Sequence, residues 1–245
     1  MTGILAHRGF SGKYPENTML AFKKAAELDI EGFETDVQMT KDGVLVLTHD
    51  EEISRVSNGE GFVKDLTLED LKALDFRCGM DEFELNDDTR IPTLEEFFTW
   101  FKDTDLLINI ELKSSMIRYE GMVYKTMKMI EEFDLVDRVI ISSFNHRDVL
   151  NAKELMPEIK CGFLTWSLFL NPGVYTSKYG IDYYHPDFNA MDDEDFKDCH
   201  ENGIGILPYT VDEKEDMRKL VDKNVLYIIT NYPDRAMEVI GARHV

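Results

Sequence analysis

The sequence predicts an α/β protein with a (β/α)8 TIM-barrel fold and a small insertion after the second strand. Three observations lead to this prediction. Short apolar runs alternate with amphipathic stretches from end to end, the pattern of repeated strand–helix units. The chain has 245 residues, a length that suits one large barrel with a single core. One stretch, between Asp50 and Ile91, interrupts the rhythm with no clean strand–helix unit.

The predicted strands are short runs of apolar and β-branched residues, separated by enough chain for a helix after each. In chain order they are Ile4–Ala6, Gly32–Met39, Leu106–Leu112, Arg138–Ser142, Lys160–Leu164, Ile181–Tyr184, Gly205–Tyr209 and Leu226–Thr230.

Amphipathic patterns between the strands predict the helices, and start signals support two of them. Thr93 precedes Leu94, and Asp212 precedes Glu213, both of which are arrangements that favour a helix N-terminus. The helices are expected near Thr18–Leu28, Leu94–Lys102, Gly121–Phe133, Arg147–Leu155, Pro172–Tyr179, Asp192–Asn202, Glu213–Asp222 and Asp234–Ile240.

Residues 50–91 are interpreted as an insertion within a single domain that spans residues 1–245. Just before it, Val44–Thr48 is expected to pair back on Gly32–Met39 through a turn at Lys41-Asp42-Gly43. Loops that follow barrel strands lie at the catalytic face, so we expect the insertion to shape substrate access.

Composition and charge exclude several classes of partner. Lys and Arg total 27 against 48 Asp and Glu, a net charge of -21 that argues against binding nucleic acid or an anionic membrane surface. Cys78, Cys161 and Cys199 show no CxxC spacing, which argues against a disulfide framework and a zinc site. With no signal-peptide pattern and no long apolar run, we expect a cytoplasmic protein without stable membrane association. The oligomeric state stays open.

Three carboxylates predict a site for a hard cation. Glu34 and Asp36 lie two residues apart on one predicted strand, so both side chains project from the same face. Such neighbours repel each other unless a cation lies between them. Glu111 and Lys113 repeat this spacing on the next barrel strand, so Glu111 is the third candidate ligand and Lys113 a candidate phosphate contact. The alternative, solvated charges near loop ends, has about even odds for either pair alone.

Two histidines are candidates for general acid–base catalysis. His7-Arg8-Gly9 closes the first strand, where Gly9 allows a sharp turn and Arg8 can hold a phosphate bidentately. His49 follows the Val44–Thr48 run, and its neighbour Asp50 can fix the tautomer of the ring. A lone histidine is more often structural, but two beside acidic pairs and basic residues favour catalysis.

Other motifs narrow the chemistry further. The sequence contains no Gly-rich phosphate loop, GxSxG or HExxH, which weighs against serine hydrolases and zinc proteases. His185 follows the sixth strand and is a candidate for lining a substrate pocket, although Pro186 beside it suggests a turn.

These motifs resemble the glycerophosphodiester phosphodiesterase family over essentially the whole chain, most specifically in the first half. The matching segments are His7-Arg8-Gly9, Pro15-Glu16-Asn17-Thr18, Gly32-Phe33-Glu34-Thr35-Asp36-Val37, Thr40-Lys41-Asp42-Gly43, Thr48-His49-Asp50, Arg55, Asn58-Gly59, Thr67-Leu68-Glu69-Asp70-Leu71, Ile91-Pro92-Thr93-Leu94-Glu95-Glu96, Asn109-Ile110-Glu111-Leu112-Lys113, Thr210-Val211-Asp212 and Ile228-Ile229-Thr230-Asn231-Tyr232-Pro233.

The resemblance implies a TIM-barrel enzyme that hydrolyses small-molecule glycerophosphodiesters to sn-glycerol 3-phosphate and an alcohol. It implies that His7 and His49 serve as acid and base, that Glu34, Asp36 and Glu111 bind one divalent cation, Mg or Ca, and that Arg8 and Lys113 contact phosphate.

The chain also departs from the family pattern. Tyr209 stands where the family often has Trp, and it can still wall a glycerol pocket. Asn231 stands where Asp is frequent, and Glu16 and Asn17 are expected just outside the reacting groups.

Two other functions remain as alternatives. One is a related phospholipase or lyase acting on an intact lipid headgroup, which would need an apolar or basic rim. The other is a non-catalytic barrel that binds a phosphate ligand.

Overall fold

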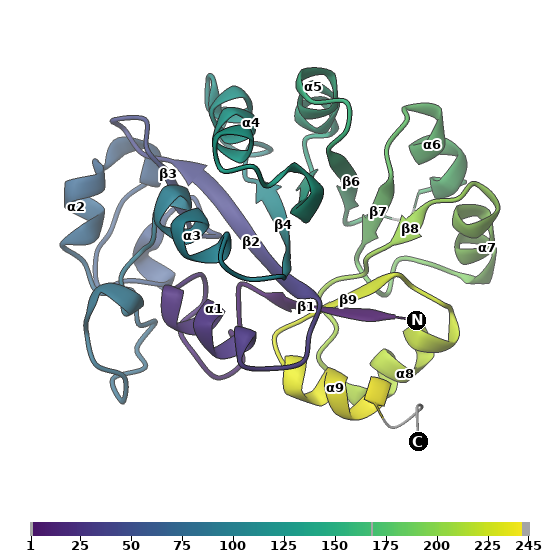
Figure 1. Ribbon diagram of the computed structural model, residues 1–245, viewed down its shortest axis with the longest axis horizontal. Coiled ribbons are helices and arrows are strands. Elements are labelled where there is room, and N and C mark those ends of the chain that lie inside the picture. The colour runs from purple at the N-terminus through teal and green to yellow at the C-terminus, as the bar shows by residue number, and fades with distance from the viewer. Residues whose placement is uncertain (1, 168, 242–245) are drawn as a thin grey trace.

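Parallel strands form the inner wall of the protein in the computed structural model, which describes residues 2–167 and 169–241. Along the sheet they are ordered β8-β7-β6-β5-β4-β2-β1-β9, a nearly closed barrel that confirms the predicted fold (Figure 1). The bounds are β1 Gly3–His7, β2 Gly32–Met39, β4 Leu107–Leu112, β5 Val139–Ser143, β6 Lys160–Thr165, β7 Tyr183–Pro186, β8 Gly205–Ile206 and β9 Tyr227–Thr230.

The barrel closes between its last two strands through single backbone hydrogen bonds. Leu226 N donates to Ile206 O at 2.9 Å, and Ile229 N donates to Pro208 O at 3.1 Å. The predicted strand at 205–209 is therefore shorter than expected, because Pro208 has no N–H to donate and a regular ladder cannot pass through it.

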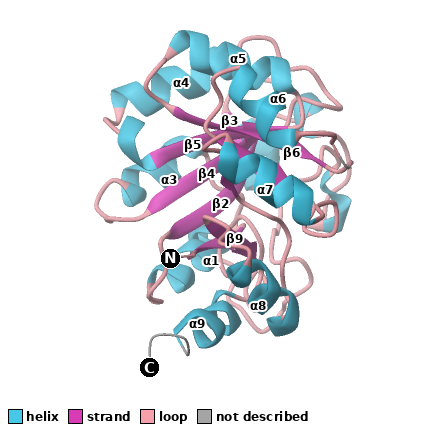
Figure 2. Ribbon diagram, turned by 90° about the vertical axis from the view of Figure 1, so that its right-hand side faces the viewer, coloured by secondary structure: helices cyan, strands magenta, loops and turns pink. Residues whose placement is uncertain are grey.

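Helices cover the outside of the barrel, and the two views show them surrounding the strands (Figure 2). Their bounds are α1 Met19–Ala26, α3 Leu94–Phe101, α4 Met122–Glu132, α5 His146–Leu155, α6 Pro172–Lys178, α7 Asp193–Glu201, α8 Lys214–Asp222 and α9 Pro233–Gly241. Thr93 caps α3 in a reciprocal capping box with Glu96, as predicted. Asp212 does not cap α8, whose N-cap is Glu213, so this start signal was wrong.

The two faces of the barrel strands have different surroundings. Side chains that point outward, such as Phe33 and Ile110, pack with the helices in the main hydrophobic core. Inside the barrel a smaller apolar cluster forms from Leu5, Ile140 and Leu207 with Ile229. The charged residues Glu34, Asp36 and Glu111 lie on β2 and β4.

A short strand follows β2 just before residues 50–91, as predicted. β3, Leu45–Leu47, pairs antiparallel with β2. The segment that follows contains the short helices η1 Ile53–Arg55, η2 Val63–Asp65, α2 Leu68–Lys72 and η3 Asp87–Thr89. It has its own hydrophobic cluster, built from Val46, Ile53, Val56, Val63, Leu71, Phe76 and Ile91. In Figure 1 α2 lies at the edge of the molecule, beyond β3 and α3.

Candidate active site

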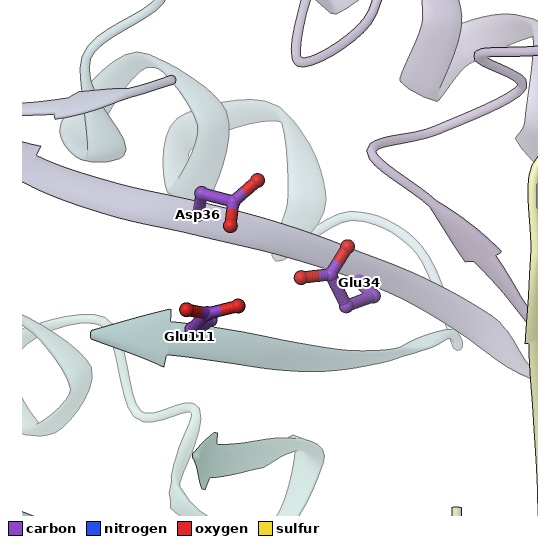
Figure 3. Close-up of side chains that lie close together, drawn as sticks. All are labelled: Glu34, Asp36 and Glu111. Carbon is purple, nitrogen blue, oxygen red and sulfur yellow. The ribbon is translucent and has the colours of Figure 1, made fainter. Parts of the chain in front are cut away.

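Three carboxylates meet on the inner face of two neighbouring strands. Glu34 and Asp36 lie on β2, and Asp36 is paired in register with Glu111 on β4. All three side chains are buried, and one oxygen from each lies within 4.8 Å of the others. Figure 3 shows the three groups converging from the two strands.

The electrostatics of this cluster are unfavourable without a counter-charge. Burial, and after it the neighbouring charge of Asp36, raises the pKa of Glu34 well above its ordinary value. Burial also raises the pKa of Glu111, and Lys113 offsets this only in part. For Asp36 burial acts in the same direction, but Arg8, His49 and Lys113 outweigh it and lower the pKa.

The donor set fits a hard divalent cation. Oδ1 of Asp36 and Oε1 of Glu111 are buried and accept no hydrogen bond, although the ammonium of Lys113 lies 3.9 Å and 3.0 Å from them. Carboxylate oxygens are the ligands that Mg²⁺ and Ca²⁺ prefer, and unpaired buried carboxylates are costly. The acidic cluster is therefore a candidate metal site of three oxygen ligands.

Two cationic side chains lie against the carboxylates. Nε of Arg8 lies 3.2 Å from Oδ2 of Asp36. Lys113 is buried, and although burial disfavours its charge, Glu111 and Asp36 raise the pKa of the ammonium. Arg8 has φ 55 and Gly9 has φ 75, so the chain turns sharply where β1 ends. A Cβ on Gly9 would come within 2.6 Å of the Ala21 backbone, which explains the glycine.

His7 is held by a chain of polar contacts from the other end of the sequence. Its Nδ1 lies 2.7 Å from Oδ1 of Asn231, whose Nδ2 donates to Asp212 at 2.7 Å. Because the amide nitrogen is used by Asp212, the oxygen faces the ring and Nδ1 carries the proton. Nε2 then has the free lone pair and lies 3.7 Å from Glu34. Burial, and after it Arg8, lowers the pKa of His7 to about 3, so the ring is neutral at pH 7.

His49 is the more exposed of the two rings and has a charged partner. Its Nδ1 lies 2.6 Å from Oδ1 of Asp50. Burial alone would raise the pKa of Asp50, but hydrogen bonds from His49 and Arg55 outweigh it and lower the pKa, so the carboxylate stays charged. The carboxylate on Nδ1 fixes the orientation of the ring and leaves Nε2 directed away from it.

The two candidate pocket residues differ in position. The hydroxyl of Tyr209 donates to the backbone oxygen of Thr165 at 2.9 Å, and its ring meets Phe144 edge-on. His185 has no exposed surface, and neither ring nitrogen has a hydrogen-bond partner. Its ring lies over Gly162, where an added Cβ would be 2.2 Å from Nε2. That Tyr209 and His185 line a substrate pocket stays a prediction.

Several residues around the site were not identified as functional candidates from the sequence. Gln38 donates to the backbone oxygen of His49 at 2.9 Å. Its spacing was a usable signal, because Gln38 is two residues beyond Asp36 on the same strand face. Asn17 donates to Asp36 at 3.0 Å, and the sequence placed it only near the site. The contact between His7 and Asn231 spans 224 positions, and no local pattern reveals it.

Comparison with known proteins identifies the group to which this site belongs. Residues 7–235 match the model of a family described as the glycerophosphoryl diester phosphodiesterase family. A glycerophosphodiester phosphodiesterase of Caldanaerobacter subterraneus subsp. tengcongensis is 43% identical over 239 residues, covering 98% of both chains. One from Bacillus altitudinis is 38% identical over 242 residues, again covering 98% of both.

Solved structures share the fold. A phosphodiesterase of Oleispira antarctica, in complex with its product sn-glycerol-3-phosphate, is 26% identical with a TM-score of 0.87, over 98% of this chain and 97% of that one. A putative glycerophosphoryl diester phosphodiesterase of Silicibacter pomeroyi has a TM-score of 0.89 at 21% identity, over 100% of this chain and 95% of that one.

Proposed function

The chain belongs to the glycerophosphoryl diester phosphodiesterase family, and from that premise we propose that it hydrolyses small glycerophosphodiesters to sn-glycerol 3-phosphate and an alcohol with the help of one divalent cation. One observation carries the metal dependence: three buried carboxylates lie within 4.8 Å of one another, and Oδ1 of Asp36 and Oε1 of Glu111 accept no hydrogen bond. The product bound to the Oleispira antarctica phosphodiesterase supports the substrate class.

Each part of the proposed chemistry has a residue to perform it. A divalent cation held by Glu34, Asp36 and Glu111 would neutralise the cluster and polarise a non-bridging phosphate oxygen. The guanidinium of Arg8 and the ammonium of Lys113 lie beside the carboxylates, where they can share the remaining charge of the phosphate. Positioning and charge stabilisation account for most of the barrier lowering in phosphoryl transfer.

The surroundings of the two rings favour separate roles in proton transfer. Asn231 holds Nδ1 of His7 and leaves Nε2 with a free lone pair, so His7 is the group that takes the proton from the nucleophile. Asp50 holds Nδ1 of His49 and leaves Nε2 facing away from it, so His49 is the group that gives a proton to the alkoxide as the P–O bond breaks. The nucleophile is water or the free glycerol hydroxyl, and His7 receives the proton in either route. General acid–base steps of this kind contribute about 10²–10⁴-fold each.

The first test is release of glycerol 3-phosphate from glycerophosphocholine and glycerophosphoethanolamine, with Mg²⁺ or Ca²⁺ and again with EDTA. We expect release that needs the cation and falls by at least about 10²-fold in His49→Ala, because the leaving alkoxide loses its acid. Release that does not need the cation, or an unchanged rate of release in His49→Ala, would contradict the proposal.

A second candidate substrate is favoured by an apolar rim near the site. A groove of about 400 Å³ is lined by residues that include Met116, Phe144 and Trp166, which follow β4, β5 and β6. Met116 is 75% exposed and Trp166 67%, so two large apolar side chains that line this groove are open to solvent. Such a rim suits a glycerophosphodiester that carries an acyl chain. Among the described residues no helix is long and apolar enough to cross a bilayer.

Lysophosphatidylcholine and glycerophosphocholine separate these substrates, because they differ in the acyl chain alone. If the rim binds that chain, Trp166→Ala should lower kcat/KM for the lysophospholipid by about 10-fold, the value of about 1.4 kcal/mol of lost apolar contact. The same variant should leave glycerophosphocholine turnover unchanged. Equal effects on both substrates, or no turnover of the lysophospholipid, would exclude the second candidate.

A further inference from the structure

A continuous set of charged contacts leaves the barrel, passes through the insertion and returns. It begins at His49, whose ring is bonded to Asp50. Nε of Arg55 donates to the other oxygen of Asp50. Nη1 and Nη2 of Arg55 donate to the two oxygens of Glu16, each at 2.8 Å. This set of contacts ends at Arg8, whose Nη1 donates to Glu16 at 2.9 Å.

Asp50 stands at the start of residues 50–91, and Arg55 is the link that comes from further within them. It ends η1, and its neighbours Ile53 and Val56 are buried in the insertion's own hydrophobic cluster. The backbone of Arg55 is thereby fixed, and the guanidinium reaches back from the insertion to the barrel face. The insertion therefore does more than border the site, because one of its side chains contacts partners of two site residues.

The geometry requires an arginine. A guanidinium is planar and presents its donors in a fixed fork, so Arg55 can bind Glu16 through two parallel hydrogen bonds while Nε binds Asp50. A lysine is a single point charge on a flexible stem and cannot hold both carboxylates at once. Fixing Asp50 fixes the ring of His49, and fixing Glu16 fixes the guanidinium of Arg8.

The alternative is an ordinary surface ion pair. The side chain of Arg55 is 49% exposed, and exposed ion pairs contribute only about 0–1 kcal/mol to stability. Removing Arg55 should therefore change folding little. Arg55 differs from other surface pairs in its partners. Asp50 is hydrogen-bonded to His49, the proposed acid, and Glu16 is hydrogen-bonded to Arg8, the proposed phosphate contact.

We propose that Arg55 is a positioning residue that aligns His49 through Asp50 and Arg8 through Glu16, so that the insertion couples proton transfer to phosphate binding. The proposal deepens the proposed function and rests on it. It assigns the two arms different effects: the His49 arm acts on kcat, and the Arg8 arm acts on KM. It also makes Glu16 and Asp50 energetically coupled across the shared guanidinium.

Arg77 provides a matched control within the same insertion. It forms a comparable fork on Asp75 and donates to the backbone oxygen of Phe83, and within the described part of the chain its side chain forms hydrogen bonds and ion pairs only with residues 75–83. Arg77→Gln therefore removes the same charge and a similar ion pair without touching the site. Any loss shared by Arg55→Gln and Arg77→Gln reports on folding of the insertion and not on alignment.

The kinetic experiment measures kcat, KM and thermal unfolding for Arg55→Gln, Arg55→Lys and Arg77→Gln, with the cation present. We expect kcat/KM to fall about 10–100-fold in Arg55→Gln, the usual cost of removing an orienting partner. Arg55→Lys should recover only one arm, either kcat or KM, and Arg77→Gln should stay within about 2-fold of wild type. Equal losses in Arg55→Gln and Arg77→Gln, or wild-type rates in Arg55→Gln, would overturn the proposal.

A double-mutant cycle and a spectroscopic readout complete the test. Glu16→Gln and Asp50→Asn should have non-additive effects in the wild type and additive effects in the Arg55→Gln background. The Nδ1–H proton resonance of His49, assigned by its loss in His49→Ala, should persist in Arg77→Gln and shift or broaden in Arg55→Gln. This resonance needs no turnover. If the wild type is inactive the proposed function fails, and an unchanged resonance in Arg55→Gln still refutes the alignment separately.

Discussion

At the scale of single residues, two histidines show how surroundings decide chemistry. His7 has a partner on Nδ1 and its other nitrogen near Glu34, so the ring is held in one orientation, as its proposed role in proton transfer requires. His185 is fully buried, and neither of its ring nitrogens has a hydrogen-bond partner. Burial lowers the pKa of His185 to about 3, and it is the main cause of the same change in His7. Both rings are therefore neutral in the fold at pH values where a free histidine is charged.

The lowered pKa values of the two rings predict that the free energy of unfolding falls as the pH drops below about 6.5. Between pH 6.5 and about 3 the unfolded chain binds a proton on each ring and the folded chain does not, so unfolding gains up to about 1.4 kcal/mol per pH unit per ring. Between pH 6.5 and pH 5 the free energy of unfolding, measured in urea, should therefore fall by up to about 2 kcal/mol less in His185→Gln than in the wild type. An unchanged pH dependence in His185→Gln would contradict this, and the exposed His200 serves as the control position.

At the scale of elements, pairs of strands are fitted to each other by side-chain size. Gly162 on β6 has no side chain because the ring of His185 on β7 occupies the space where a Cβ would lie. The periodicity of β6 predicts a strand but does not show which neighbour needs the room. The same limit applies to α8, where Asp212 resembles a helix cap but instead binds Asn231 and Thr230.

The fit between β6 and β7 predicts the outcome of Gly162→Ala. Its new methyl group would lie 2.2 Å from Nε2 of His185 in a buried setting, and overpacking of this kind costs about 1–3 kcal/mol. His185→Ala should restore part of that loss, so the double variant should be less destabilised than the sum of the two single variants. Denaturant unfolding of the three variants measures this, and strictly additive losses would show that the two residues do not compete for space.

At the scale of the whole molecule, the sequence predicted what depends on local periodicity. The strand order, the helices and the insertion follow from apolar spacing and turn residues, and the acidic cluster follows from the two-residue spacing of Glu34 and Asp36 on one strand. The contacts of Arg55 and Asn231 were beyond that reasoning, because they join segments far apart in the chain and depend on the closed barrel.

The bond between His7 and Asn231 also has a consequence for how the protein is made. During synthesis β1 appears first, but its second neighbour, β9, and the amide of Asn231 appear last. Glu34, Asp36 and Glu111 all lie in the first half of the chain. A chain released before Asn231 is added would therefore contain all three carboxylates but lack the amide that holds Nδ1 of His7. The site is therefore complete only after the last strand of the barrel has been synthesised.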